Sequence, residues 1–326
     1  MSGDCVIGVD LGGTKVLAGA IDSDLRVHGR AQRAVGADDQ DGILESVVSV
    51  VEDVRANSSM EVHAVGLGVP CLLDSDRGTA VMAVNLPWEE LDVRSLMSER
   101  TGLPVFVDND ANLALLAEHR AGAAAGTRHA AMLTVGTGIG GALLFNGALY
   151  RGARGAAGEL GHMVVDVDGP PCQGNCPNHG CLESVASGTA LAREALRVAR
   201  STPDCGLGRA LEAGRTITGP LVTELAHDGD TAARDVVALI GTRLGVGMAN
   251  LVNMLNPDVV VVGGGVIGAG ELLLAPAREV VAARALPPSR EQARIVRAHF
   301  GSEAGMVGAG ALALEGLGVA SSWPSA

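Results

Sequence analysis

Three cysteines and a histidine lie close together in the segment ELGHMVVDVDGPPCQGNCPNHGCLE, which starts at residue 159. The cysteines are Cys172, Cys176 and Cys181, and His162 precedes the first of them by ten positions. Three thiolates and one imidazole complete the tetrahedral coordination that zinc prefers, and they leave no position for a substrate. We therefore predict that these four side chains bind a structural zinc ion.

The same loop has other interpretations. The cysteines could be ordinary loop thiols, or two of them could form a disulfide bond. The sequence shows no signal peptide, so we expect a cytoplasmic, reducing compartment in which disulfides are disfavoured. His179 is a second candidate for the fourth ligand, although the loop would have to bend sharply to bring it to the same ion. Cys5, Cys71 and Cys205 have no evident role.

A glycine turn near the start of the chain is a candidate phosphate site. Residues 6–21 form two apolar runs that flank Gly-Gly-Thr at residues 12–14, a pattern typical of a β-hairpin. Backbone N–H groups in such a turn can bind phosphate oxygens. Asp10, at the end of the first run, could hold a hydrated magnesium ion. The alternative is a plain hairpin with a surface lysine, Lys15.

The segment LTVGTGIGGALL, residues 133–144, repeats this pattern. Two units of strand, glycine turn and strand indicate a repeated architecture with a nucleotide between the halves. The surrounding residues 130–150 contain no charged side chain and exceed the length of a membrane span. Their glycines instead favour two buried strands around a turn, so we expect a soluble protein that does not enter a membrane.

A candidate catalytic carboxylate follows another strand pattern. Residues 104–112 read PVFVDNDAN, an apolar run that ends in Asn109 and Asp110 before a predicted helix. A carboxylate between a strand end and a helix start is well placed for chemistry. An Asp at this place can equally serve as the N-cap of the helix. The residues alone leave both roles open.

Apolar spacing predicts the elements that must position these side chains. Apolar residues recur at helical spacing over residues 41–56, and residues 62–69 form a predicted buried strand. Residues 186–215 and 220–255 are predicted to be mostly helical, and a strand over 259–262 leads into three glycines.

The composition limits the class of protein. The chain has 326 residues, of which 47% are hydrophobic. The hydrophobic fraction is enough for a sizeable core. The chain is too long for one compact lobe, so we expect two domains. The net charge is −13 and only 2% of the residues are aromatic. Nucleic-acid binding needs a basic surface, and single-strand binders add stacking aromatics, so we expect no direct contact with nucleic acid.

Four segments in order, DLGGTK, NDA, GTGIGG and ELGH with GCLE, resemble the ROK family of sugar kinases and repressors. The resemblance extends from Val6 to about Leu314. It implies an α/β, two-domain actin-like ATPase (ribonuclease H-like) fold with an interdomain cleft. The implied domains are a small α/β domain, residues 1–112 plus about 304–326, and a large α/β domain, residues 113–303, which carries the zinc loop at residues 162–181.

The sequence departs from the family pattern at three places. The family usually separates its first two cysteines by one residue, whereas three residues separate Cys172 from Cys176. Cys71 stands where the family usually has glycine after proline, and Ala142 stands where a further glycine is common.

The resemblance also assigns roles to single residues. Asp110 corresponds to the catalytic base. His162 would bind zinc through one ring nitrogen and a sugar hydroxyl through the other. The implied sugar-binding residues are Asn85, Asn109, Asp110, Glu159, His162 and Glu183. The implied nucleotide-binding residues are Asp10, Gly12, Gly13, Thr14, Lys15, Gly136, Thr137, Gly138, Gly140, Gly263, Gly264 and Gly265.

These assignments imply ATP-dependent phosphorylation of a hexose, above all of glucose to glucose 6-phosphate, with ATP, Mg²⁺ and a structural Zn²⁺. Mannose, fructose, allose and N-acetylhexosamines such as N-acetylglucosamine remain alternative substrates, and polyphosphate an alternative donor. A repressor or a non-catalytic sugar sensor is the alternative from another class. ROK repressors carry an extra N-terminal DNA-binding domain, whereas here the phosphate motif begins at Val6. Family members are often dimers or tetramers, so we expect a homodimer or homotetramer.

Overall fold

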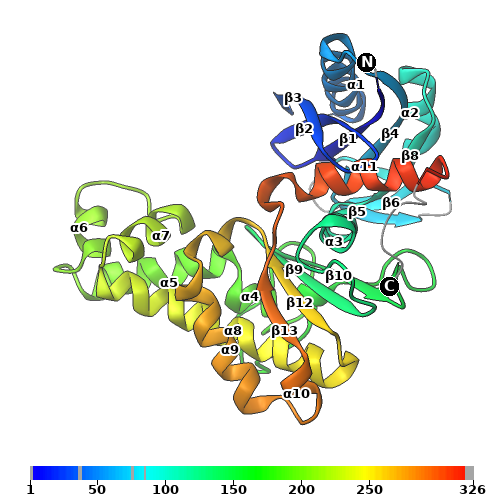
Figure 1. Cartoon of the computed structure of the whole chain (residues 1–326). Coiled ribbons are helices and arrows are strands. Elements are labelled where there is room, and N and C mark those ends of the chain that lie inside the picture. Colours follow the sequence, from blue (N-terminus) through cyan, green and yellow to red (C-terminus); the bar gives the residue numbers. More distant parts are fainter. Residues whose placement is uncertain (1–2, 36–38, 75–76, 84–85, 320–326) are drawn as a thin grey trace. The chain divides into compact units, whose positions relative to one another are not determined.

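The computed structural model describes residues 3–35, 39–74, 77–83 and 86–319 (Figure 1). Their contacts divide the chain into two compact units. The first unit comprises the described residues of 1–128, 142–158 and 299–326, and the second comprises 129–141 and 159–298. The domain limits inferred from the sequence, 1–112 with about 304–326 and 113–303, stay a prediction.

The first unit is built on a five-stranded sheet among the described residues, in the order β3-β2-β1-β4-β8. The strands are β1 (Asp4–Leu11), β2 (Lys15–Ile21), β3 (Val27–Ala34), β4 (Glu61–Val69) and β8 (Val105–Asn109). β1 and β2 pair antiparallel around residues 12–14, so the predicted hairpin is confirmed. β4 lies parallel to β1 and to β8, which places the ends of these three strands at one edge of the sheet.

Two apolar clusters cover this sheet. Helix α1 (Gln40–Asn57) packs on β1, β2 and β3, as its predicted apolar stripe requires. Helices α3 (Asp110–Ala121) and α11 (Ala304–Gly316) pack on each other and on β4 and β8. Ile7 belongs to the cluster with α1, and the adjacent Val6 belongs to the cluster with α11. Since neighbouring side chains of a strand point to opposite faces, the sheet has helices on both faces.

Glycines let α11 lie unusually close to the sheet. A Cβ on Gly8 of β1 would stand 2.0 Å from the carbonyl oxygen of Met306, and one on Gly66 of β4 would stand 1.8 Å from that of Ala309. No side chain fits at either position while α11 stays in place.

The remaining elements of the first unit are a small sheet and a helix. A three-stranded sheet forms in the order β5-β6-β7 among the described residues. Its strands are β5 (Cys71–Asp74), β6 (Thr79–Ala83) and β7 (Glu89–Asp92), and α2 (Val93–Thr101) follows. Trp88, just before β7, is 2% exposed and packs in the cluster with α1. Cys5 and Cys71, which the sequence left without a role, are buried in the same cluster.

A second sheet has the order β11-β10-β9-β12-β13 among the described residues. Its strands are β9 (Ala130–Val135), β10 (Ile139–Phe145), β11 (Ala148–Leu149), β12 (Val259–Gly263) and β13 (Arg294–Arg297). If the five strands of each sheet are numbered one to five in chain order, both sheets have the spatial order 3-2-1-4-5. The repeated architecture inferred from the glycine turns is therefore present. The division between the units falls within β10.

Helices supply most of the second unit. They are α4 (Leu182–Ala186), α5 (Gly188–Ser201), α6 (Gly206–Glu212), α7 (Gly219–His227), α8 (Thr231–Leu255), α9 (Glu271–Arg284) and α10 (Ser289–Gln292). Short 3₁₀ helices occur at Leu160–His162 (η1), Gly265–Ala269 (η2) and, in the first unit, Gly301–Glu303 (η3). Cys205 caps α6, because its Sγ accepts a hydrogen bond from the N–H of Gly208.

Helix α8 is the long helix of the second unit and lies beside α9 (Figure 1). It ends at Leu255 because Asn256 takes a left-handed conformation with φ of 45° and Pro257 cannot continue a helix. Among the described residues it alone has the length and apolar composition of a membrane span, and 61% of that window is buried in the protein. The apolar residues 130–150 instead form β9 and β10 around the glycine turn, as predicted, and also the short strand β11, which was not predicted.

Candidate active site

Asp110 stands where β8 passes into α3. It is the first residue of the helix, and the preceding Asn109 is the N-cap. Oδ1 of Asn109 accepts hydrogen bonds from the N–H groups of Ala111 at 2.9 Å and Asn112 at 3.3 Å. The capping role that the sequence left open for Asp110 thus belongs to Asn109, although Oδ1 of Asp110 also accepts from Ala111 at 2.9 Å. Asp110 is partly exposed.

Asn109, a predicted sugar ligand, has little freedom left. Its oxygen serves the helix N-terminus, and its Nδ2 donates to the carbonyl oxygen of Cys71 at 3.3 Å. Any contact of its side chain with a substrate must therefore use the remaining N–H of the amide. Asn85, another predicted sugar ligand, lies outside the described residues.

A buried ion pair fixes the strand end that carries these residues. Asp108 is 2% exposed, and its Oδ2 accepts from Nε of Arg151 at 2.8 Å and from Nη2 at 2.6 Å. Its Oδ1 accepts from the N–H of Asn109 at 2.7 Å and from Nδ2 of Asn112 at 3.0 Å. Residue spacing in the sequence does not predict this pair. The available signal was an Asp at the end of a buried strand, because a buried carboxylate needs a partner.

Asp10 lies near the end of β1, beside the first glycine turn, residues 12–14. Burial raises the pKa of Asp10 to about 6, and the Lys15 charge only partly opposes this. A Cβ on Gly305 would stand 2.6 Å from Cγ of Asp10, so the carboxyl group packs against the first turn of α11. A cation bound beside such a partly desolvated carboxylate would favour its charged form.

The first glycine turn itself is open. The N–H of Gly12 bonds the carbonyl oxygen of Lys15 at 2.9 Å and closes the turn. Gly13, Thr14 and Lys15 are exposed, so their backbone is accessible to a phosphate.

The second glycine turn, residues 136–138, joins β9 to β10 in the second unit. The N–H of Gly136 bonds the carbonyl oxygen of Gly138 at 2.9 Å. The start of α5 lies against this turn: the N–H of Gly188 donates to Gly136 at 2.8 Å, and the hydroxyl of Thr189 donates to Thr137 at 2.8 Å. A helix N-terminus beside an open glycine turn is a favourable place for an anion.

A cavity of about 600 Å³ adjoins the second glycine turn. Gly136 and Thr137 line it together with Gly265, so the structure brings the turn and one of the three predicted glycines to one site, whereas Gly263 and Gly264 do not line this cavity. Apolar side chains that include Ile217 and Val266 form other parts of its wall. Gly264 has φ of +85°, and a Cβ there would stand 2.4 Å from the carbonyl oxygen of Val135, which explains a glycine at this position.

The predicted zinc ligands converge. One donor atom from each of His162, Cys172, Cys176 and Cys181 lies within 4.8 Å of every other. Nδ1 of His162 is 3.5 Å from Sγ of Cys172, and Sγ of Cys176 is 3.9 Å from Sγ of Cys181. Tetrahedral zinc with Zn–S bonds of about 2.3 Å separates its sulfurs by about 3.8 Å, so the donor set fits. His179 is exposed and is outside this group of donors.

The cysteine loop, residues 162–181, accommodates its unusual spacing by folding back on itself. Val164 bridges to Cys181 and Pro171 to His179 in antiparallel fashion, and the N–H of Cys172 bonds the carbonyl oxygen of Asn178 at 2.9 Å. These bonds bring Cys172 back to Cys176 and Cys181 despite the extra residues between them.

Glu159 is the N-cap of the 3₁₀ helix η1, and His162 is its last residue. Nε2 of His162 lies 3.8 Å from Oε2 of Glu159, on the side of the ring opposite the Nδ1 that faces the cysteines. The two ring nitrogens therefore have separate surroundings, as a double role of His162 requires.

Glu183, predicted only as a sugar ligand, contacts the second glycine turn. Its Oε2 accepts from the N–H of Ile139 at 2.8 Å, and its Oε1 lies 3.8 Å from Sγ of Cys172. A Cβ on Gly138 would stand 2.2 Å from the same carboxylate, so this close approach depends on a glycine. Spacing along the sequence gave no sign of the contact.

The ROK family model matches residues 6–316. The chain belongs to the ROK family. It is 35% identical to a glucokinase of Halalkalibacterium halodurans over 315 residues, 95% of either protein. A ROK family glucokinase of Streptomyces griseus, solved in complex with glucose and AMPPNP, matches with a TM-score of 0.86 and 35% identity over 95% of this chain and 99% of that one. The family and the α/β fold predicted from the sequence are thereby confirmed.

The ROK family also contains repressors. A putative xylose repressor of Caldicellulosiruptor is 33% identical over 262 residues, which are 78% of this chain and 64% of that protein.

Proposed function

We propose that this ROK family protein is an ATP-dependent hexose kinase that converts glucose to glucose 6-phosphate. The observation that carries the proposal is its similarity, over nearly the full length of both chains, to a ROK glucokinase that binds glucose and AMPPNP. The Asn109-Asp110 pair, the two glycine turns and the cysteine loop are all present.

Asp110 serves as the general base in this proposal. The oxygen of the primary hydroxyl of the sugar attacks the γ-phosphorus of ATP while the bond from that phosphorus to the bridging oxygen breaks. The carboxylate of Asp110 takes the hydroxyl proton, and ADP leaves with the electrons of the broken bond. Because this chemistry depends chiefly on alignment and charge neutralisation, the N-cap of Asn109 and the ion pair of Asp108 matter as supports of the strand end.

The sugar hydroxyls are assigned to a small set of polar side chains. His162 offers Nε2 while its Nδ1 faces the cysteines, and Asn109 offers an amide N–H. The full proposed set is Asn85, Asn109, Asp110, Glu159, His162 and Glu183.

The nucleotide is assigned to the two glycine turns and the cavity beside the second one. The cavity of about 600 Å³ has the size of small-molecule sites in proteins, and we assign it to the adenosine. The phosphates are assigned to the turns at 12–14 and 136–138. Magnesium, when bound, would neutralise phosphate charge, and we assign Asp10 to hold it through water.

Zinc is assigned to His162, Cys172, Cys176 and Cys181, with a structural role. The three sulfurs and the nitrogen fill its coordination sphere, so the ion shapes the loop and takes no part in the transfer itself.

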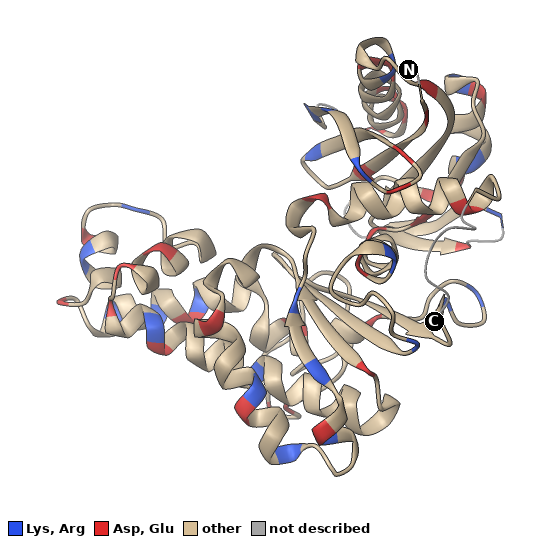
Figure 2. Cartoon of the chain, in the orientation of Figure 1, with Lys and Arg blue, Asp and Glu red and all other residues tan. Residues whose placement is uncertain are grey.

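The setting of the enzyme follows from the same family membership. We assign it to the cytoplasm, as a homodimer or homotetramer with small-molecule substrates. Along the helices of the second unit, Arg residues are interspersed with Asp and Glu (Figure 2), and the net charge of the chain is −13. Because a chain with this negative net charge does not attract phosphate backbones, a kinase is favoured over a DNA-binding repressor.

A coupled assay of ADP release tests the proposal. Purified protein is supplied with Mg-ATP and, in turn, glucose, mannose, fructose, allose and N-acetylglucosamine, and the series is repeated with polyphosphate in place of ATP. We expect the highest kcat/KM with glucose and ATP. A preference for another hexose or for polyphosphate would correct the substrate or the donor. If no combination of sugar and phosphate donor gives turnover, the alternative of a non-catalytic sugar sensor would be favoured.

A further inference from the structure

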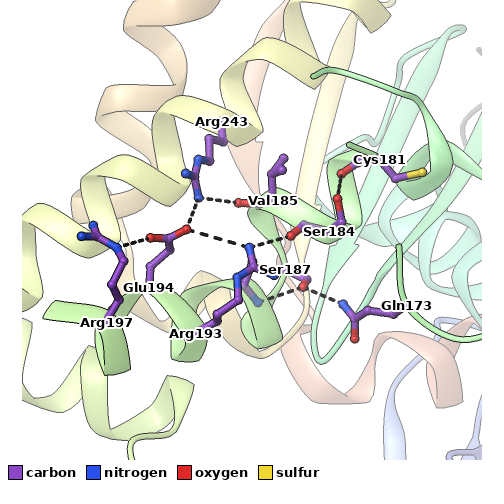
Figure 3. A network of polar contacts seen from close by, with 10 residues as sticks. Gln173, Cys181, Ser184, Val185, Ser187, Arg193, Glu194, Arg197 and Arg243 are labelled. Atoms are coloured by element: carbon purple, nitrogen blue, oxygen red, sulfur yellow. Dashed lines mark hydrogen bonds and ion pairs between the residues drawn. The ribbon is translucent and has the colours of Figure 1, made fainter. Parts of the chain in front are cut away.

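Gln173 reaches out of the cysteine loop. It lies between Cys172 and Cys176, among the residues that lengthen this loop relative to the usual family spacing. Its Nε2 donates a hydrogen bond to Oγ of Ser187 at 3.1 Å, and the two side chains point toward one another in Figure 3. Ser187 is fully buried and Gln173 is half-buried, so this bond is partly buried.

Ser187 is the joint between two helices. It ends α4 and is the N-cap of α5, because its Oγ accepts from the N–H of Ala190 at 3.2 Å. The next two residues, Gly188 and Thr189, bond the carbonyl oxygens of the second glycine turn. The side chain of Gln173 is thus bonded to the residue that directly precedes the contact between α5 and this turn.

Further polar contacts immobilise this joint (Figure 3). Arg193 donates to the carbonyl oxygen of Ser184 at 2.9 Å, and Arg243 donates to that of Val185 at 3.3 Å. These are orphan carbonyls at the end of α4, which need donors from outside the helix. Glu194 accepts from Arg243 at 3.0 Å. Burial raises the pKa of Glu194, but the arginine bonds outweigh it and lower that pKa overall.

The joint borders the cavity beside the second glycine turn. Gly188 and Thr189 line this cavity of about 600 Å³ with Gly136 and Thr137. A small displacement of the start of α5 would therefore change the position of its N–H groups and of the turn together. Glu183 makes a parallel connection, from the residue two positions after Cys181 to the N–H of Ile139.

We propose that Gln173 is a positioning residue for the nucleotide: it ties the cysteine loop to the start of α5 and holds the second glycine turn in its binding geometry. The inference rests on the proposed function, because it takes the adjoining cavity as the nucleotide site. The cysteine loop then serves ATP as well as the sugar. Glu183 is unsuitable as a probe because it is also a proposed sugar ligand.

The substitution Gln173→Met tests this role, since Met has a similar length and cannot donate. We expect the KM for ATP and the Kd of ADP, measured by calorimetry without sugar, to rise about 2- to 10-fold, the range for one hydrogen bond. The KM for glucose and the zinc content should stay within twofold of wild type. Gln292→Met is the matched control, because Gln292 is an exposed glutamine of the same unit, and it should leave all four quantities unchanged.

A double-mutant cycle separates positioning from general stability. Ser187→Ala removes the acceptor and the cap, and adding Gln173→Met to it should raise the Kd of ADP no further. Independent, multiplying effects of the two changes would overturn the proposal, as would a Gln173→Met enzyme whose ADP affinity equals that of Gln292→Met. If either contradicting result is found while the wild-type protein binds ADP and phosphorylates glucose, only the proposed role of Gln173 is wrong. If wild type does neither, the proposed function fails with it.

Discussion

At the scale of residues, three neighbours at the end of β8 have three different tasks. Asp108 is buried and paired with Arg151, Asn109 caps α3, and Asp110 is partly exposed at the first position of the helix. The buried and capping residues leave the backbone at Asp110 little freedom. This arrangement favours Asp110, rather than Asp108, as the base.

The first prediction concerns Asp110→Asn. The amide cannot accept the hydroxyl proton, so kcat/KM for glucose should fall by about 100-fold or more, the usual scale for a lost general base. Glucose affinity, measured by calorimetry, should change little. Asp235→Asn, at an exposed position of α8, is the control. Turnover close to wild type would remove Asp110 as the base.

The second prediction concerns the pH dependence that Asp10 contributes. Burial raises the pKa of Asp10 to about 6 from 3.8, so the folded state holds this proton more tightly than the unfolded state. Its contribution to stability is therefore full below pH of about 4 and is lost as the pH rises through about 6.

In protein free of nucleotide and magnesium, Asp10→Asn should abolish this contribution to the pH dependence of stability. Relative to wild type, the variant should gain about 1–3 kcal/mol in free energy of unfolding between about pH 4 and pH 7, and it should bind Mg-ATP more weakly. Chemical denaturation over this pH range measures the first effect. The control is the exposed Asp24→Asn, and parallel pH curves for wild type and Asp10→Asn would refute the account.

At the scale of elements, connections between segments distant in sequence hold the site. The segment after β11 supplies Arg151 to the end of β8. Another connection runs from the cysteine loop to α5 through Gln173. Arg151 lies outside the helices and strands, and the cysteine loop beyond η1 has isolated antiparallel bridges in place of a continuous ladder. Side-chain bonds therefore add rigidity that a longer backbone ladder would otherwise supply.

The third prediction tests the first of these connections. Arg151→Met leaves the carboxylate of Asp108 buried without its cation and should lower the free energy of unfolding by about 1–3 kcal/mol. It should also lower kcat, because the strand end that carries Asp110 loses its support. Arg154→Met, at an exposed position of the same segment, should do neither. Equal stability of the two variants in urea would show that the pair is dispensable.

The fourth prediction concerns the cysteine loop as a metal-bound element. Purified protein should carry about one zinc per chain, and Cys176→Ser should lose it, since a hydroxyl is a poor substitute for a thiolate on zinc. Cys205→Ser is the matched control: this cysteine caps α6, and serine is a good cap. Elemental analysis that finds no zinc in active wild-type enzyme would contradict the assignment.

At the scale of the whole molecule, the two five-stranded sheets of the described residues have the same strand order, and each unit carries one glycine turn. The chain passes between the units near residues 128, 141, 158 and 298. Buried Glu118 of α3 accepts from the N–H groups of Ala123 at 2.8 Å and Phe300 at 2.9 Å. It therefore anchors, within the first unit, two of the segments that lead to the second.

The fifth prediction concerns the stability of the intact protein with its substrates. A ligand at 100 times its Kd stabilises the folded state by about 2.7 kcal/mol, so glucose should raise the midpoint of unfolding, and Mg-AMPPNP should raise it further. Asp110→Asn should show similar shifts, because the amide oxygen of Asn can still accept a hydrogen bond from the sugar and only proton removal is lost. L-glucose is the control. No shift with D-glucose would argue against glucose as the substrate.

The sequence by itself determined the elements and the types of chemistry. Short-range patterns sufficed for the glycine turns, the helix over α1, the strands and the cysteine cluster, because hydrophobic period, turn residues and ligand types are local properties. The family followed from the order of four motifs. These signals identified Asp110, His162, Cys172, Cys176 and Cys181 as residues to consider.

Only the tertiary structure decided which groups meet. It gave the cap to Asn109, paired Asp108 with Arg151, brought Gly265 to the second glycine turn, and bonded Glu183 to Ile139. These partners are up to 129 positions apart in the chain. Their contacts depend on how sheets and helices pack, and a contact between distant segments leaves no periodic mark in the sequence of either one.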